Sequence, residues 1–157
     1  PLLKGHDMGV VSESGCPGVA DPGSILVQYA HSKDIQVVPL IGPSSILLAM
    51  MSSGFNGQSF AFHGYLPKNS DELKQKIKDI EKASAQFKQT QIFIETPYRT
   101  DNLTKSLIQY SNPNSFLCIA SSLNCPDERI ISKPIHWWKK QTISFGKAPC
   151  VFLLFSK

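Results

Sequence analysis

The sequence of 157 residues predicts an α/β protein of two lobes. Short apolar runs alternate along the chain with stretches in which apolar residues recur at helical spacing. The runs at residues 116–120 and 151–155 are apolar at nearly every position, as expected for strands at the centre of a covered sheet. Because both patterns recur in the two halves, we expect strands and helices throughout the chain.

In the first half, the pattern predicts a strand, a tight loop and a helix. The loop at residues 12–23 holds three glycines and two prolines, so it is a shaped turn and not a linker. Asp21 before Pro22 is the pairing expected of a helix N-cap and a first-turn proline. We therefore expect strands at residues 8–11 and 35–40, helices at 24–31 and 44–53, and a Gly42-Pro43 turn before the second helix.

We place the lobe boundary in the aperiodic, glycine-containing stretch before Phe60, which gives domains at residues 1–57 and 58–157. In the second domain, Ser70 is a natural N-cap for a helix at residues 70–85. Thr96 and Pro97 open another helix that runs to Tyr110. The remaining expected elements are strands at 92–95, 116–120, 129–131 and 151–155, and a helical turn at 135–140.

The composition excludes several classes of protein. Hydrophobic residues make up 41% and charged residues 18%, which is typical of a chain that forms a core. No apolar run approaches the roughly 20 residues that span a bilayer, and nothing resembles a signal peptide, so we expect a cytoplasmic protein without membrane association. The four cysteines and four histidines lack metal-ligand spacing, so no metal site and no disulfide framework is expected. The net charge of +4 is compatible with an anionic partner.

The loop at residues 12–23 is the first candidate site. In an open α/β sheet, a loop after a strand lies where ligands bind, and glycine lets backbone N–H groups approach them closely. The Gly42-Pro43 turn repeats this arrangement after the next predicted strand.

Four blocks of sequence, in order, resemble a known family. They are Ser12-Glu13-Ser14-Gly15-Cys16-Pro17-Gly18-Val19-Ala20-Asp21-Pro22-Gly23, Val37-Val38-Pro39-Leu40-Ile41-Gly42-Pro43-Ser44-Ser45, Phe62-His63-Gly64-Tyr65-Leu66-Pro67 and Phe93-Ile94-Glu95-Thr96-Pro97-Tyr98-Arg99. The chain resembles the tetrapyrrole-methylase superfamily of S-adenosyl-L-methionine-dependent methyltransferases. Within it, the blocks are similar to the branch that methylates a ribose 2′-hydroxyl of small-subunit ribosomal RNA.

The resemblance implies a two-lobed fold whose second lobe is a mixed sheet with flanking helices, a homodimer, and ribosomal RNA as partner. It implies that the two glycine-proline loops line a cleft for S-adenosyl-L-methionine. The cofactor-binding candidates are Gly15, Cys16, Pro17, Gly18, Asp21, Pro22, Gly42, Pro43, Ser44 and Ser45.

Methyl transfer to a ribose hydroxyl requires in-line positioning and gains from a general base. Glu95 and Glu13 are the candidate catalytic bases, and Arg99 is the candidate substrate-binding residue because arginine binds phosphate as a bidentate donor. Structural alternatives remain open for each. Glu95 can cap the following helix, Arg99 can pair with Glu95, Asp21 can act as the N-cap, and Cys16, which replaces a threonine of the family, can be a passive small residue.

Two departures from the family pattern leave the function open. The family's opening Gly-x-Gly-Pro-Gly loop does not occur, so we expect the first lobe to be incomplete. After the strand at residues 116–120, the branch has Arg-Glu-Leu-Thr-Lys where this chain has Ser121-Ser122-Leu123-Asn124-Cys125. The alternatives are therefore methylation of a tetrapyrrole or another small molecule, and a non-catalytic cofactor-binding or dimerisation module.

Overall fold

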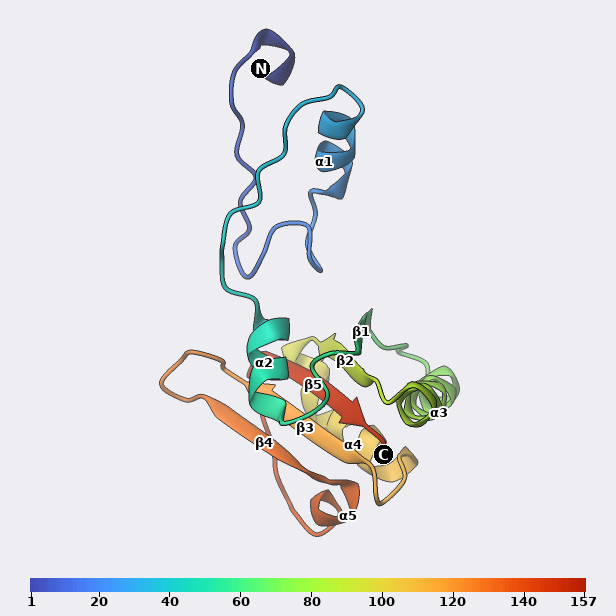
Figure 1. Cartoon of the computed structure of the whole chain (residues 1–157). Coiled ribbons are helices and arrows are strands. Elements are labelled where there is room, and N and C mark those ends of the chain that lie inside the picture. The colour runs from blue at the N-terminus through green and yellow to red at the C-terminus, as the bar shows by residue number, and fades with distance from the viewer. The chain divides into compact units, whose positions relative to one another are not determined.

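The computed structural model describes residues 1–157 as two compact units (Figure 1). The first unit is Pro1–Ser44 and the second is Ser45–Lys157. The division falls before helix α2 (Ser45–Ser53), whereas the sequence predicts it after this helix, at residue 57. The reason is that Ile46, Ala49 and Met50 of α2 are buried in a core cluster of the second unit.

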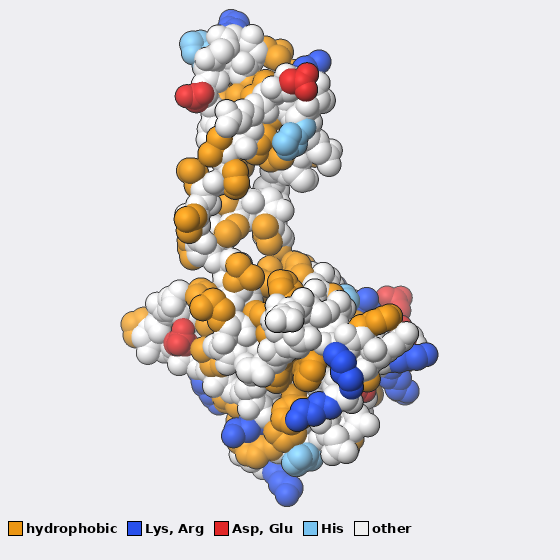
Figure 2. Space-filling model, viewed as in Figure 1, with side chains coloured by type: hydrophobic (Ala, Val, Ile, Leu, Met, Phe, Trp, Pro, Cys, Tyr) orange, Lys and Arg blue, Asp and Glu red, His pale blue; other side chains and the backbone are white.

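The first unit contains little regular structure. It holds a short 3-10 helix, η1 (Leu2–Lys4), and helix α1 (Ser24–His31). The predicted strands at residues 8–11 and 35–40 are wrong, because neither segment pairs with another strand. A strand needs a neighbour for its backbone N–H and C=O groups. Apolar side chains of both segments are at the surface, with Val11 90% and Leu40 88% exposed (Figure 2).

The start of α1 corrects the N-cap expected at Asp21. Gly23 occupies the N-cap position, and its carbonyl oxygen accepts hydrogen bonds from the Leu26 and Val27 amides at 3.0 and 3.2 Å. Gly23 has a φ of 132°, a conformation that residues with a Cβ rarely adopt. Asp21 and Pro22 therefore precede the helix and do not begin it.

The second unit is built on one mixed five-stranded sheet. Its strands are β1 (Phe60–Tyr65), β2 (Thr90–Glu95), β3 (Phe116–Ser121), β4 (Arg129–Pro134) and β5 (Cys150–Phe155). Their order across the sheet is β1-β2-β5-β3-β4. β1 and β2 are parallel, while the other three pairs are antiparallel. The predicted mixed sheet with flanking helices is confirmed.

Helices cover both faces of this sheet. On β5, Phe152 and Leu154 join the cluster that includes α3 (Ser70–Phe87), α4 (Thr100–Tyr110) and α5 (Ile135–Trp138). Val151 and Leu153 point to the opposite face and pack with α2. Because successive strand residues face opposite sides, a strand buried on both faces must be apolar throughout. This accounts for the continuous apolar runs in β3 and β5.

Two helix starts differ in detail from prediction. Asn69, and not Ser70, caps α3: its Oδ1 accepts hydrogen bonds from the Asp71 and Glu72 amides at 2.9 and 3.2 Å. After Thr96, the chain forms a 3-10 turn, η2 (Pro97–Arg99), before α4 begins. None of the helices combines the length and apolar character needed to cross a membrane.

Candidate functional site

Cys16 joins the two predicted cofactor loops within the first unit. Its Sγ lies 3.2 Å from the Pro43 carbonyl oxygen and 3.9 Å from that of Gly42, so the thiol can donate a weak hydrogen bond to the turn. The two loops are more than 25 residues apart in sequence, and this side chain lies where they meet. Cys16 therefore has a tertiary contact, in contrast to the passive role considered from the sequence.

The backbone of the first loop is open at its glycines. Gly15 and Gly18 both have a φ of 76°, and a Cβ built at either position would meet no atom within 4 Å. The Val19 amide donates to the Cys16 carbonyl at 3.2 Å and closes a turn between them. A ligand can approach such a backbone closely. The backbone at Gly15 and Gly18 is therefore accessible to a ligand.

The other candidates around these loops are arranged differently. Glu13 is exposed beside a local turn in which the Ser12 hydroxyl donates to the Ser14 carbonyl oxygen. Pro17 and Pro22 are exposed, and Asp21 is half-buried. Ser45 begins α2, so the predicted Gly42–Ser45 group is divided between the two units.

In the second unit, Glu95 and Arg99 form an ion pair where β2 ends. The Glu95 side chain is completely buried, and its Oε2 lies 3.1 Å from Arg99 Nη1. Oε2 forms no hydrogen bond of good geometry, so this contact is an ion pair only. Oε1 accepts hydrogen bonds from the Thr96 amide at 2.7 Å and the Thr96 hydroxyl at 3.2 Å. Arg99 Nη2 also lies 3.4 Å from the Pro67 carbonyl oxygen.

These contacts show that Glu95 orients the start of η2 and the Arg99 guanidinium. The ion pair and the contact with the Thr96 amide are the structural alternatives that the sequence left open for Glu95 and Arg99. Since Arg99 remains about a quarter exposed, it can still contact an anion while Glu95 holds it. The general-base role of Glu95 and of Glu13 stays a prediction.

A row of paired residues extends across the sheet from Glu95. Glu95 is opposite Cys150, Cys150 is opposite Ser121, and Ser121 is opposite Arg129. The Arg129 carbonyl accepts a hydrogen bond from the Ser121 hydroxyl at 3.1 Å. Burial raises the pKa of the Cys150 thiol to about 12, which keeps it protonated near neutrality. Arg129 lies at one end of this row, and Glu95 at the other end is paired with Arg99. These are the two arginines of the chain.

Asp101 is a structural residue that sequence reasoning missed. Its Oδ1 accepts a hydrogen bond from the Phe145 amide at 2.8 Å, and its Oδ2 accepts one from the Ser144 hydroxyl. Burial raises the pKa of Asp101, but the hydrogen bonds from Ser144 and Phe145 outweigh it and hold this pKa below its usual value. Arg129 lies over the Phe145 ring at 4.9 Å. Through these hydrogen bonds, Asp101 connects the segment before β5 to the start of α4.

The loop that departs from the family pattern is held by its own acids. The Ser122 hydroxyl donates to Asp127 Oδ2 at 2.8 Å, and the Asn124 amide donates to Glu128 Oε2 at 2.8 Å. Ser122 and Asn124 adopt positive φ angles of 48° and 62°. Both carboxylates therefore accept hydrogen bonds from groups of the loop itself. The structure contains no group of three or more His, Cys, Asp or Glu side chains that could hold a metal ion.

Comparison with known proteins finds sequence relatives of the chain among methyltransferases. No protein-family model matches the chain. Over 134 residues the chain is 33% identical to ribosomal RNA small subunit methyltransferase I of Vibrio cholerae, covering 85% of this chain and 45% of that protein. The chain is a sequence relative of this methyltransferase. The protein of the same name from Halalkalibacterium halodurans is 29% identical over 145 residues, covering 90% of this chain and 49% of its own length.

These relatives confirm the resemblance inferred from the four blocks. The chain spans about half the length of the curated relatives it matches.

Two solved structures share the fold of this chain. Diphthine synthase matches with a TM-score of 0.62 at 17% identity, over 91% of this chain and 57% of the synthase. The methyltransferase CobJ matches with a TM-score of 0.60 at 16% identity, over 92% of this chain and 62% of that protein. At such low identity the likeness establishes the fold alone, and it agrees with the fold class expected from the sequence.

Proposed function

We propose that this chain is part of an S-adenosyl-L-methionine-dependent methyltransferase that methylates a ribose 2′-hydroxyl of small-subunit ribosomal RNA. The observation that carries the proposal is the 33% identity, over 134 residues, to ribosomal RNA small subunit methyltransferase I. The fold shared with CobJ and diphthine synthase supports it.

The first unit would contribute to cofactor binding. When bound, S-adenosyl-L-methionine supplies an electrophilic methyl group on a sulfonium. The open backbone at Gly15 and Gly18 and the turn at Gly42-Pro43, joined by Cys16, would hold its polar groups. Such a site acts mainly by positioning, so it needs neither a metal nor a covalent nucleophile.

In the second unit, Arg99 would bind a phosphate of the acceptor, and Glu95 would fix the direction of its guanidinium. The 3.1 Å ion pair supports this division of roles. Glu95 and Glu13 remain the proposed bases for the ribose hydroxyl. They differ in environment, because Glu95 is buried while Glu13 is exposed. A pH profile of methyl transfer for Glu95→Gln and Glu13→Gln would separate the two, since only loss of the base removes the acidic limb.

We also propose a homodimer, as the family resemblance implies, and the cytoplasmic location expected from the sequence. Sedimentation of the purified protein tests the dimer, and a single species at the monomer mass would contradict it.

A small-molecule acceptor is the second candidate function. The observation that favours it is the loop at Ser121–Cys125, whose side chains carry no charge and whose neighbouring acids Asp127 and Glu128 are engaged within the loop. An RNA acceptor predicts affinity that falls steeply with salt, whereas a tetrapyrrole predicts absorbance changes on titration and little dependence on salt.

Calorimetric titration of S-adenosyl-L-methionine tests the cofactor assignment. It would use this chain and a longer chain that spans the full length of the curated relatives. Gly18→Val places a side chain in the open space of the loop and should abolish binding. Gly5→Val is the matched control, because Gly5 has a nearly identical φ of 77° and equally open surroundings outside the loop. Absence of binding in both lengths of chain would overturn the proposal.

Transfer of a radiolabelled methyl group to small ribosomal subunits tests the acceptor. A 2′-O-methylated linkage resists alkaline hydrolysis, because the hydroxyl that would attack the phosphate is blocked. We expect the label to remain in an alkali-resistant dinucleotide. Label that is released as a mononucleotide, or that appears only with a tetrapyrrole acceptor, would contradict ribose methylation.

A further inference from the structure

The charges of the chain are segregated along the sequence. Residues 102–157 contain seven of the 16 Lys and Arg residues but only two of the 12 Asp and Glu residues. Those two acids are Asp127 and Glu128, and both are hydrogen-bonded within their own loop. This part of the chain therefore has a surplus of positive charge within its own sequence. Figure 2 shows Lys and Arg side chains on the face of the second unit opposite to α4 as well.

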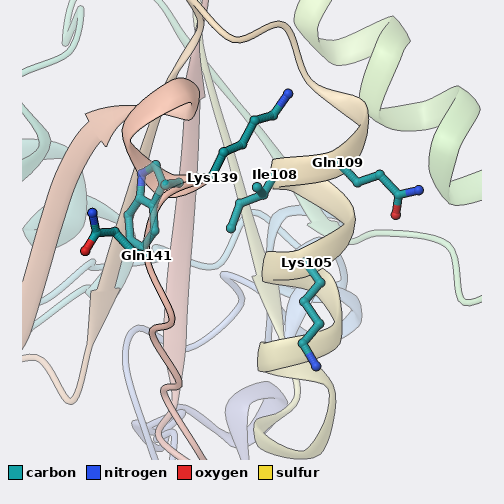
Figure 3. A pocket seen from close by; sticks show the side chains of 6 residues that line it. Lys105, Ile108, Gln109, Lys139 and Gln141 are labelled. Carbon is teal, nitrogen blue, oxygen red and sulfur yellow. The ribbon is translucent and has the colours of Figure 1, made fainter.

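Two of these lysines border a groove on the outer side of α4. The groove has a volume of about 440 Å³ and lies between α4 and the segment that follows α5 (Figure 3). Lys105, Ile108 and Gln109 line it from α4, and Trp138, Lys139 and Gln141 line it from the other side. Lys105, Lys139 and both glutamines are exposed, while Trp138 is buried and forms part of the wall. The groove thus presents cations and amides around an apolar base.

An exposed aromatic ring stands at the other end of α4. Tyr98, in the turn that leads into this helix, is 79% exposed. Lys147 Nζ lies 5.4 Å from the centre of its ring. Lys147 lies two residues after Phe145, which is hydrogen-bonded with Ser144 to Asp101 of α4, so the ring and the lysine belong to connected elements. From Thr100 to Gln109, α4 is about 14 Å long.

Asp101 is an acid beside this surface. Its carboxylate accepts hydrogen bonds from Ser144 and Phe145, and it attracts Lys105. Among the lysines of this surface, Asp101 therefore interacts with Lys105.

We propose that the strip formed by Tyr98, Lys105, Lys139 and Lys147 binds a single-stranded segment of RNA. The proposal rests on the proposed function, because it concerns the acceptor of that methyl transfer. Lysines bind backbone phosphates, and an exposed aromatic ring provides a stacking surface for an unpaired base. The amides of Gln109 and Gln141 can hydrogen-bond base edges. An anionic lipid surface would also attract lysines, and binding to vesicles distinguishes it from RNA.

The first test measures the binding of a fluorescently labelled single-stranded 12-nucleotide RNA by anisotropy at several salt concentrations. Lys105→Gln combined with Lys139→Gln removes two cations from the strip. We expect affinity to fall about tenfold and the slope of log K against log salt to become flatter by about 1.4, since each phosphate contact on a single strand contributes about 0.7. The matched control is Lys78→Gln with Lys82→Gln, two exposed lysines of α3.

The second test concerns the ring. Tyr98→Ala should weaken RNA binding about tenfold, while Tyr98→Phe should preserve it, because stacking requires the ring and not the hydroxyl. Phe87→Ala is the matched control, since Phe87 is a 61% exposed aromatic residue at the end of α3. The same variants are also mixed with anionic phospholipid vesicles and with duplex RNA.

The outcomes separate this proposal from the cofactor assignment. Loss of RNA affinity in the strip variants, with S-adenosyl-L-methionine titration unchanged, supports the strip. Equal RNA affinity in strip and control variants overturns it, as does absence of RNA binding or an equal preference for duplex RNA or vesicles. Failure of S-adenosyl-L-methionine to bind would overturn the proposed function but would leave the RNA measurement readable by itself.

Discussion

Similar apolar sequences form a buried strand in one unit and an exposed, unpaired segment in the other. Residues 151–154 and residues 35–40 are both rich in apolar side chains, most of them branched aliphatic ones. In the second unit the run becomes β5, with neighbours on both sides and buried residues on both faces. In the first unit the run has no strand partner, and Val38 is 63% exposed. The comparison teaches that apolar composition selects a strand only where a neighbouring strand completes its hydrogen bonds.

The largest effect expected from this difference concerns core side chains. Phe152 is fully buried and its ring stacks on Phe93 at 5.7 Å. Phe152→Ala should lower the free energy of unfolding by about 3–5 kcal/mol, because it leaves a cavity. Val38→Ala should change it by less than about 0.5 kcal/mol. Urea unfolding followed by circular dichroism measures the free energy of unfolding of both variants. Equal losses would mean that the two units do not differ in how their apolar side chains contribute to stability.

A smaller effect is expected at the glutamates. Glu95→Gln leaves Arg99 without its counter-charge and should cost about 2 kcal/mol of unfolding free energy, less than for a fully buried pair because Arg99 is partly exposed. Glu13→Gln, at an exposed position, should be neutral within about 0.5 kcal/mol. The fluorescence of Trp137 and Trp138, which both lie in the second unit, follows the unfolding of Glu95→Gln. A neutral result for Glu95→Gln would mean that the ion pair does not stabilise the fold.

Helix capping should produce a loss of about 1 kcal/mol in the second unit. Asn69→Ala removes the side chain that accepts the Asp71 and Glu72 amides. Ser70→Ala, at the neighbouring position that the sequence favours, should have no such cost. In the first unit α1 begins without a side-chain cap, so Ser24→Ala should likewise be silent. Thermal unfolding of the three variants ranks them, and a larger loss for Ser70→Ala would restore the cap predicted from the sequence.

The smallest expected effect is a dependence on pH. The pKa of Asp101 is lowered in the folded state, so the unfolded state binds the proton more readily. This residue therefore contributes stability above its unfolded pKa near 3.8, and the contribution is lost as the pH falls through the lower folded value. The stability difference between the native protein and Asp101→Asn should be larger at pH 6 than at pH 3.

Asp34→Asn, an exposed acid of the first unit, is the control for this pH series. If the stability difference between the native protein and Asp101→Asn is the same at every pH, the ionised carboxylate of Asp101 does not stabilise the Ser144 segment.

Much of the second unit could be predicted because local pattern and tertiary burial agree there. β3 is apolar from Phe116 to Ala120 and β5 is apolar throughout, and α3 places Leu73, Ile77 and Ile80 on one face. The choice between Asn69 and Ser70 could not be predicted, since both residues are good caps. It depends on which carbonyl accepts the first helical bond, and that carbonyl belongs to Asn69, which accepts from the Leu73 amide at 2.9 Å.

The candidate site could be predicted only as separate loops. The blocks of sequence located the loop around Gly15 and Gly18, the Gly42-Pro43 turn and the Glu95-Arg99 segment. The contact of Cys16 with Pro43 and that of Asp101 with Ser144 join residues 27 and 43 positions apart. Pairs at such separations have no periodic signature, so only the folded chain reveals them.

The exposed run at residues 35–41 also bears on how the protein behaves in concentrated solution. Unpaired stretches of branched aliphatic side chains can stack between molecules into intermolecular β-sheets. Pro39 interrupts this stretch, because it has no amide hydrogen to donate to a neighbouring chain. We therefore expect Pro39→Val to favour pairing of this segment between molecules of this chain.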